Sequence, residues 1–189
     1  NNSNAGGNVV QGNFIGTDVT GTAALSNAAD GITLSGASWT LVGGTHAGAR
    51  NVISGNGGRG VMIDANGATG NVIQGNYIGT DVTGAARLGN GYGGVEILNA
   101  SSNVVGGAEA GARNVISANG LSGVTINNSN AGGNVVQGNF IGTDWTGTNA
   151  LGNRRSGVFI AGVVGNVVGG AHAGEGNVIS GNAENGVLL

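Results

Sequence analysis

Carboxylates that could bind a metal ion recur at three equivalent places in the sequence. Asp18, Asp81 and Asp144 each stand in a G-T-D-x-T-G motif, beside threonine hydroxyls and main-chain carbonyls. Calcium requires about six to eight oxygen ligands, and only one carboxylate serves each loop. Hydrogen bonds between side chain and main chain that fix a turn explain the motif more simply. We therefore expect turn-forming aspartates and keep calcium binding as the alternative.

The two histidines occupy one equivalent position in different copies of a second loop. His46 and His172 stand in T-H-A-G-A-R and A-H-A-G-E-G, whereas Glu109 takes this place in A-E-A-G-A-R. A zinc site needs about three or four ligands within bonding distance, and this position is not constantly histidine. We predict solvated loop histidines, no metal site and no cofactor.

The elements that position these residues repeat with a period of 63. The stretch 1–18, NNSNAGGNVVQGNFIGTD, recurs letter for letter at 127–144, and a divergent copy occupies 64–81. A period of tens of residues decides the architecture of a chain before any local pattern does. We treat residues 1–189 as a single segment of three repeats, 1–63, 64–126 and 127–189.

Each repeat divides into two turns of 31 to 32 residues that contain short strands. Apolar-x-apolar triplets such as ITL, VMI and VEI follow glycine in every turn, which is the period-two pattern of a strand. In the turn 103–133 we expect strands at 103–105, 114–117 and 124–126. Such short strands bury a core only when turns stack and equivalent strands pair in parallel. Inward residues of the first two turns should be Val10, Ile15, Ile32, Leu34, Val42, Ile53, Val61 and Ile63.

The pattern G-V-x-I, a polar turn and N-x-V-x-G-N-x-I resembles the repeat of a known fold family. It is similar to right-handed parallel β-helices of the pectate-lyase-like kind, especially the Asn/Gly-rich tandem repeats of bacterial secreted and surface proteins. The resemblance covers the whole chain and implies an all-β solenoid of about six turns with three short strands per turn. It implies little about activity, because the fold hosts lyases, hydrolases, adhesins and passive stalks.

Asparagine and aromatic residues recur at fixed positions of these turns. Asparagine tolerates left-handed backbone, and stacked amides can hydrogen-bond along a solenoid. We predict a structural ladder at Asn13, Asn51, Asn76, Asn114, Asn139 and Asn177, and note a second series at Asn27, Asn56, Asn90, Asn119, Asn153 and Asn182. An outward apolar column should contain Phe14, Val52, Tyr77, Val115, Phe140 and Val178. Long loops with Leu25, Leu88 and Leu151 as lids could cover it, or it could make lateral contacts together with Trp145.

Catalytic groups of pectate-lyase-like enzymes lie on the outward face of the sheet that here begins after each G-V. That face should present Thr33, Met62, Glu96, Thr125, Phe159 and Leu188. Glu96 is its only carboxylate, whereas hydrolysis needs paired acids and β-elimination needs a base beside a cation. We therefore predict that this segment is not an enzyme.

Composition and charge exclude several classes of partner. The chain has 43 glycines, no cysteine, no proline and a net charge of −3, with 8 % charged residues. A disordered chain would need more charge and less apolar content than the 39 % found here. The six cationic residues are dispersed arginines, so we expect no nucleic-acid binding. No apolar run approaches the length of a membrane span, so we expect no membrane insertion.

Two functions of different classes fit this description. The first is a structural, non-catalytic segment of an extracellular or cell-surface fibre, stalk or adhesin. Because the chain holds a whole number of repeats, its two ends match, and copies could stack head to tail into filaments. The alternative is a carbohydrate-binding module, or the inactive rod of a polysaccharide-degrading enzyme, with Trp39, Tyr92, Trp145 and Phe159 as its only plausible sugar platforms.

Overall fold

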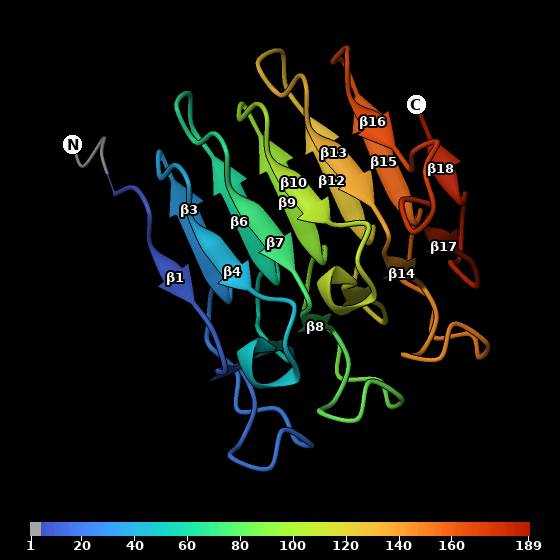
Figure 1. Cartoon of the computed structure of the whole chain (residues 1–189). Helices are drawn as coiled ribbons and strands as arrows, with labels where there is room; N and C mark the ends of the chain where they lie inside the picture. Colours follow the sequence, from blue (N-terminus) through green and yellow to red (C-terminus); the bar gives the residue numbers. More distant parts are fainter. Residues whose placement is uncertain (1–4) are drawn as a thin grey trace.

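Three six-stranded parallel sheets form the walls of the molecule, as the computed structural model shows (Figure 1). The structure describes residues 5–189, so the first four residues of the repeat 1–63 lie outside it. The first sheet contains β1 (Val9–Val10), β4 (Leu41–Gly43), β7 (Val72–Gln74), β10 (Val104–Gly106), β13 (Val135–Gln137) and β16 (Val167–Val168). The second contains β2 (Phe14–Ile15), β5 (Val52–Ile53), β8 (Tyr77–Ile78), β11 (Val115–Ile116), β14 (Phe140–Ile141) and β17 (Val178–Ile179). The third contains β3 (Ile32–Ser35), β6 (Val61–Asp64), β9 (Val95–Leu98), β12 (Val124–Asn127), β15 (Val158–Ala161) and β18 (Val187–Leu188).

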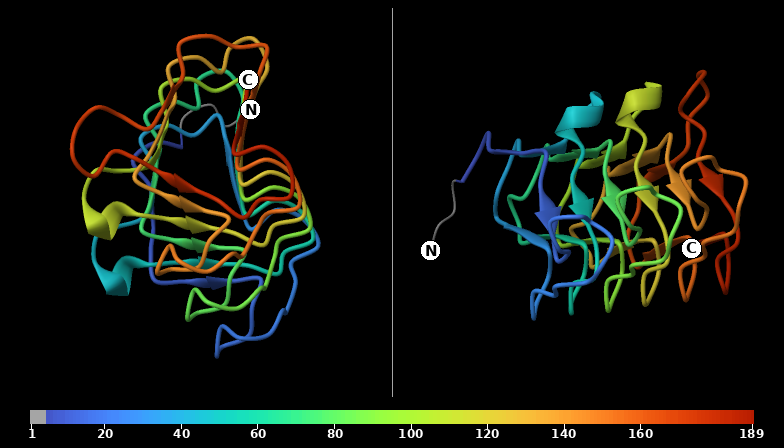
Figure 2. Two further views of the ribbon diagram at one scale, coloured as in Figure 1. Left: turned by 90° about the vertical axis from the view of Figure 1, so that its right-hand side faces the viewer. Right: turned by 90° about the horizontal axis from the view of Figure 1, so that it is seen from below.

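Each turn contributes one strand to each sheet, and equivalent strands lie next to each other. In the first sheet, Val104 pairs with Val72 of the preceding turn and Val135 of the following turn. Seen along the axis, the turns lie over one another around a common interior (Figure 2). The predicted parallel β-solenoid of about six turns, with three short strands per turn, is confirmed.

The interior is filled by aliphatic side chains from alternate strand positions. Val42, Ile53, Val61 and Ile63 are fully buried, as their inward assignment predicts. Branched side chains suit this interior because they pack well on a pleated surface. The first turn has a neighbouring turn on one side only; its Val10, Ile15 and Ile32 are half-buried, and Leu34 is buried.

Glycine is required where one turn passes closest to the next. Gly79 follows β8 with φ +90°, in the left-handed region that glycine adopts readily. A Cβ atom at this position would collide with the carbonyl oxygen of Ser117 and the side-chain oxygen of Asn119. Gly16 and Gly142 hold the same place in the other odd-numbered turns and would meet the same collision, so this glycine sets how closely the next turn can stack.

Turns of two kinds alternate along the axis. Turns one, three and five carry long loops after the second strand, and each loop closes through one antiparallel bridge: Thr17 to Ala24, Thr80 to Arg87 and Thr143 to Ala150. Turns two and four carry short 3-10 helices before that strand, η1 (Ala47–Ala49) and η2 (Ala110–Ala112). Both kinds of loop project from the stack (Figure 2). They carry the motif aspartates and the histidines, whereas Glu96 lies on β9.

Candidate functional site

The aspartates of the G-T-D-x-T-G motifs accept hydrogen bonds from their own loops. Oδ1 of Asp144 accepts the Thr146 hydroxyl at 2.7 Å and the backbone N–H groups of Thr146, Thr148 and Asn149 at 3.2–3.3 Å. Its Oδ2 accepts the Asn149 side-chain amide at 2.8 Å. Burial of Asp144 acts to raise its pKa, but the bonds from Asn149, Thr146 and Thr148 outweigh it, so the pKa lies well below its usual range. The carboxylate serves to close the loop.

Asp18 and Asp81 have the same arrangement in their loops. The Thr20 hydroxyl donates to Asp18 and, with bonds from nearby backbone N–H groups, lowers the pKa of that carboxyl. The Thr83 hydroxyl and the backbone of Ala85 donate to Asp81 in the same way. Within residues 5–189, no group of three or more His, Cys, Asp or Glu side chains is placed to hold a metal ion. Calcium binding by these loops stays the alternative, and the geometry favours turn formation.

The histidine position opens the loops of the even-numbered turns. His46 and Glu109 precede η1 and η2 with extended backbone, and neither side chain caps its helix. His46, Glu109 and His172 are all exposed, in different turns. Glu175 accepts the backbone N–H of His172 at 2.8 Å, but in the part of the chain that the structure describes none of the three belongs to a group of three or more His, Cys, Asp or Glu side chains that could hold a metal ion.

Glu96 lies on the outward face of the third sheet, in register with Met62 and Thr125 as predicted. Its carboxylate forms an ion pair with Arg59, whose guanidinium also lies 3.6 Å from Asp30. The Glu96 hydrogen bond raises the pKa of Arg59, with the nearby negative charges adding to the effect. The ion pair links neighbouring turns, and both nearby carboxylates, those of Glu96 and Asp30, contact this one guanidinium.

The predicted asparagine ladder is a continuous column of side-chain hydrogen bonds. In each step, the amide nitrogen of one asparagine donates to Oδ1 of the next at 2.9–3.0 Å; its members are Asn13, Asn51, Asn76, Asn114, Asn139 and Asn177. A second column with the same bonding contains Asn27, Asn56, Asn90, Asn119, Asn153 and Asn182. We call these the first and second ladders.

Sequence reasoning missed a third ladder, just before the strands of the first sheet. It contains Asn71, Asn103, Asn134 and Asn166, bonded through the same amide and Oδ1 atoms. The signal was their spacing of 31 to 32 residues, but Thr40 interrupts the series in the second turn. The backbone N–H of Thr40 donates to Oδ1 of Asn71, whereas its buried hydroxyl has no partner.

The outward column of the second sheet is largely covered, in part by glycines of the long loops. The ring of Tyr77 packs against Gly84 and that of Phe140 against Gly147, the glycines that follow the motif threonines. Leu25 is 72 % exposed, so its expected role as a lid is wrong; Leu88 is half-buried and Leu151 buried. Leu25 follows the bridge that closes its loop and stays exposed, whereas the glycines of the motifs pack on the rings.

Arginines from the even-numbered turns cover the other side of these rings. The Arg50 guanidinium carbon lies 4.1 Å from the ring centre of Tyr77, and that of Arg113 lies 4.2 Å from Phe140. These are cation–π distances. Tyr77 is only 6 % exposed, whereas Phe14, which has no arginine over it, is 45 % exposed.

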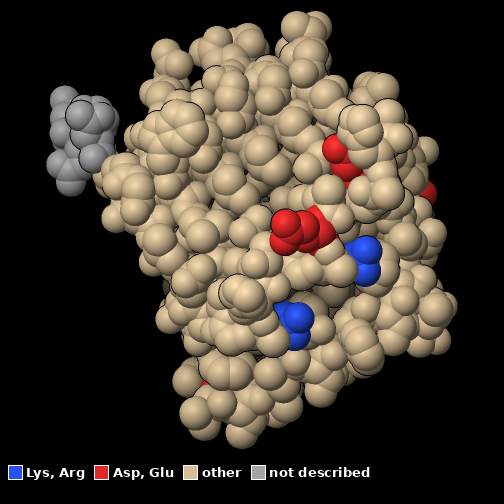
Figure 3. All heavy atoms as spheres, in the orientation of Figure 1, with Lys and Arg blue, Asp and Glu red and all other residues tan. Residues whose placement is uncertain are grey.

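A hollow of about 200 Å³ lies above this column, with the η1 and η2 loops on one side and the fifth-turn loop on the other. We call it the arginine–aromatic groove; its lining residues are Arg50, Tyr77, Ala110, Arg113, Val115 and Trp145. On this mostly uncharged face, cationic atoms surface at two separate places, with acidic atoms close to them (Figure 3). The predicted contact residues Tyr77 and Trp145 therefore lie together, and Phe14 and Phe140 lie outside this lining.

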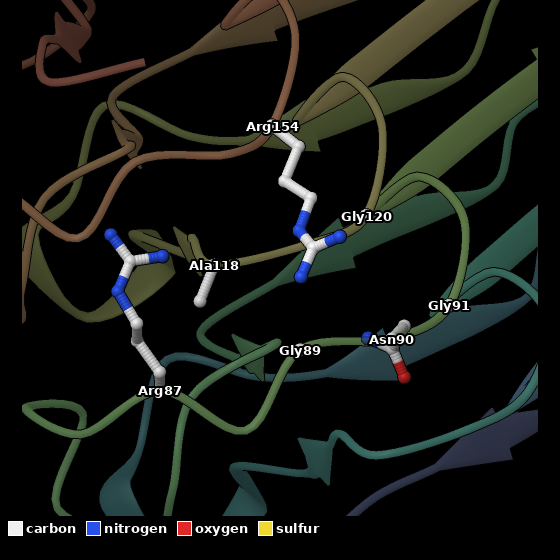
Figure 4. A pocket seen from close by; sticks show the side chains of 7 residues that line it. All are labelled: Arg87, Gly89, Asn90, Gly91, Ala118, Gly120 and Arg154. Carbon is white, nitrogen blue, oxygen red and sulfur yellow. The ribbon is translucent and has the colours of Figure 1, made fainter. Parts of the chain in front are cut away.

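A second hollow of about 330 Å³ lies over the short fourth turn, between the long loops of turns three and five. The side chains of Arg87 and Arg154 both point toward it above a floor of Gly89, Gly91 and Gly120 (Figure 4). Arg87 is held by a 3.0 Å hydrogen bond from Nη1 to the Gly152 carbonyl. The floor is main chain, so this hollow offers charge but no aromatic surface.

No known protein family, curated protein or solved structure matches this chain. Among the described residues, no helix combines the length and apolar character needed to cross a membrane. The fold and the geometry of these side chains are therefore the basis for assigning a function.

Proposed function

We propose that this chain is a structural, non-catalytic segment of an extracellular or cell-surface rod, of the kind found in fibres, stalks and adhesins. One observation carries the proposal: the buried polar positions are used to bind turns to one another. The three ladders run along the axis through several turns each, and their amides bond mainly to neighbouring turns. A structure of this kind resists separation of its turns and holds its two ends at a fixed distance.

The candidate catalytic groups support the same proposal by their bonding. Glu96 is engaged by Arg59, and the motif aspartates are engaged by their own loops. Hydrolysis of a glycosidic bond needs two carboxyl groups that flank one bond, and elimination needs a free base beside a cation. The two carboxylates that come near one another, those of Asp30 and Glu96, both contact the guanidinium of Arg59. In our proposal, the chain therefore resembles pectate-lyase-like β-helices in its architecture and the Asn/Gly-rich repeats of surface proteins in its function. It does not share the activity of the enzymes with that fold.

Self-association along the axis is part of the proposal. Successive turns pair in one common register, as Val10 does with Val42 and Ile73 with Val105. The strands of a second copy have the same spacing, so a second copy is a suitable partner for continuing this register. Negative-stain microscopy should show filaments of stacked copies; uniform short rods at high concentration would contradict head-to-tail stacking.

Deletion of one repeat tests the rod function. Removal of residues 64–126 joins Ile63 to Asn127, the residue that follows Ile126 in the chain, so all three sheets keep their register. We expect a cooperatively folded protein whose long dimension in small-angle X-ray scattering falls by two strand spacings, about 9.6 Å. Deletion of 64–110 is the control, because it joins unlike parts of two turns and should prevent folding.

Two results would overturn the rod proposal. One is a repeat-deleted chain that fails to fold or keeps its original length. The other is release of new sugar ends from a panel of polysaccharides by the intact chain, because a passive rod has no such activity.

A further inference from the structure

The six arginines of this chain differ in whether they contact a carboxylate. Among the described residues, ion pairs within 4.0 Å involve Arg59 alone. The other five arginines have no carboxylate partner, and four of them line the two hollows in pairs, Arg50 with Arg113 and Arg87 with Arg154. Cationic pairs around a hollow, in a protein with a net charge of −3, indicate an anionic ligand.

Arg50 and Arg113 are fixed in position before any ligand arrives. Each is half-buried, stacks on a ring of the next turn, and donates from Nε to a main-chain oxygen, of Gly75 at 3.4 Å and of Gly138 at 3.1 Å. Their Nη atoms donate to no described residue. A guanidinium held in this way loses little freedom on binding and keeps its two outer nitrogens for a carboxylate or sulfate.

Trp145 adds an exposed flat ring beside these arginines. It replaces the valines found at the equivalent positions, Val19 and Val82, and its side chain is 54 % exposed. Its backbone N–H donates to the Gly84 carbonyl at 3.0 Å, which joins the two long loops and fixes the base of the side chain. An exposed aromatic ring of this size on a rigid loop provides an apolar face next to polar groups.

We propose that the arginine–aromatic groove binds an acidic polysaccharide, with Arg50 and Arg113 holding its anionic groups and Trp145 packing on a sugar ring. The two arginines are 63 residues apart and therefore two turns apart, about 9.6 Å along the axis. This distance is comparable with the disaccharide unit of a linear glycan. The groove follows the axis of the rod, so an extended chain can meet both arginines.

The chemistry of the groove favours a polysaccharide over other polyanions. Nucleic acid would need a denser cationic surface than these few arginines provide on an acidic protein. The open edge of a sheet would favour an acidic peptide, but the groove floor consists of the side chains Tyr77 and Val115 instead. The proposal goes beyond the rod function, which needs no ligand, and either one can fail without the other.

Calorimetric titration of the intact 189-residue chain tests the groove. The probes are oligosaccharides of hyaluronan, which carry a carboxylate on every second sugar, heparin oligosaccharides, which add sulfate, and neutral dextran. We expect saturable binding of an acidic probe, weakened by salt, and no binding of dextran. Tighter binding of hyaluronan would indicate a ligand with carboxylate groups, and tighter binding of heparin would indicate a sulfated ligand. Tryptophan fluorescence in a Trp39→Phe background should change on binding, because Trp145 is then the only indole.

Matched variants locate the site. Arg50→Gln with Arg113→Gln should weaken binding about tenfold or more, because hydrogen bonds to charged groups contribute at least that factor. Arg87→Gln with Arg154→Gln removes the same charge at the second hollow and should change affinity less than about twofold, because distant exposed charges are screened. Trp145→Val restores the residue of the equivalent positions, leaves the folded core untouched, and should weaken binding several-fold.

Several outcomes would overturn the proposal: no binding of either acidic probe, equal losses from both arginine pairs, or equally tight binding of polyglutamate or single-stranded DNA. Arg50→Lys with Arg113→Lys keeps the charge, so it covers the case in which the glutamine variant does not fold. It should still lose affinity, because lysine cannot make the two-pronged contact of a guanidinium.

Discussion

The side-chain amide of Asn76 donates to Oδ1 of Asn114 at 3.0 Å, and the same oxygen accepts the backbone N–H of Asn76 at 2.9 Å. One side-chain oxygen therefore satisfies two donors of the preceding turn. The side-chain amide of Asn114 also donates to the carbonyl of Ile73, in the preceding turn, at 2.8 Å. Each asparagine of the ladder thus satisfies polar groups that the tight stacking would otherwise bury without partners.

Replacement of Asn114 by alanine should be strongly destabilising. The change leaves the fully buried backbone N–H of Asn76 without its partner, and it removes one hydrogen bond each from the Asn76 side-chain amide and the Ile73 carbonyl. Several buried polar groups then lose hydrogen bonds together, so we expect a loss of at least about 3 kcal/mol in the free energy of unfolding. Urea unfolding followed by circular dichroism measures it.

The same substitution at Asn13 is the matched control, because Asn13 belongs to the same ladder, is exposed, and only donates from its side chain, to Oδ1 of Asn51 and to the Gln11 carbonyl. The Asn51 oxygen keeps the bond from the Asn13 backbone N–H, and water can reach the exposed Gln11, so we expect a clearly smaller loss. Equal losses at the two positions would show that burial of the ladder does not determine its contribution.

Replacement of Thr40 by asparagine should stabilise the protein. Thr40 interrupts the third ladder, and its buried hydroxyl has no partner. An asparagine amide there can donate to Oδ1 of Asn71, which already accepts the Thr40 backbone N–H at 2.9 Å. We expect a gain of about 1 kcal/mol, the usual contribution of one hydrogen bond, seen as a higher melting temperature.

A second variant separates the two causes of that gain. Thr40→Val removes the unpaired hydroxyl without adding a hydrogen bond, so it should gain less than Thr40→Asn. If the valine variant were the more stable of the two, completion of the ladder would not be the source of the stability.

Most of the fold could be predicted because it depends on period. The spacing of 31 to 32 residues and the apolar-x-apolar triplets lead to the three sheets, and strands expected at 103–105, 114–117 and 124–126 lie at Val104–Gly106, Val115–Ile116 and Val124–Asn127. The third ladder was missed for a local reason, because Thr40 takes the place of an asparagine. Periodicity identifies positions that keep their residue type and passes over those that do not.

Replacement of Gly79 by alanine should be among the most damaging single changes. Its φ of +90° disfavours any side chain, and a Cβ there would strike the Ser117 carbonyl of the next turn. Because that turn cannot move without breaking the sheets, we expect a loss of about 3 kcal/mol or more. Thermal unfolding of the purified variant, or its failure to accumulate as folded protein, measures the effect.

Gly162→Ala is the control for backbone strain alone. Gly162 has φ +68°, and a Cβ at that position would meet no atom within 4 Å. We expect a loss of only about 1 kcal/mol, the cost of left-handed backbone in a non-glycine residue. Similar losses in the two variants would mean that strain, and not the close approach of turns, decides the need for glycine.

The arginine–aromatic groove could not be predicted from the sequence, because its parts come from different turns. Arg50 and Tyr77 are in contact but stand 27 positions apart and belong to neighbouring turns, and Trp145 reaches the groove from the fifth. Trp145 was expected as a contact residue from its replacement of valine alone. The direction of an arginine side chain, along the axis onto the next turn, is set by packing that no short motif records.

Acid should weaken the loop of the fifth turn in a defined pH range. The fold lowers the pKa of Asp144, so it favours the charged carboxylate. The stability that the charged carboxylate provides is complete above the unfolded-state pKa of about 3.9. It is lost progressively as the pH falls below that value toward the lower folded-state pKa.

The variant Asp144→Asn tests this pH dependence because it removes the titrating group. It also replaces the acceptor Oδ2 with an NH2 group, which cannot accept the hydrogen bond from the Asn149 side-chain amide. We expect this variant to be about 2 kcal/mol less stable than the parent at pH 7, the size of a hydrogen bond to a charged group. The difference in urea midpoint between the two proteins should shrink between pH 4 and pH 2, about the range set by these pKa values. A difference that stays constant over this range would contradict a role for the ionised carboxylate in closing the loop.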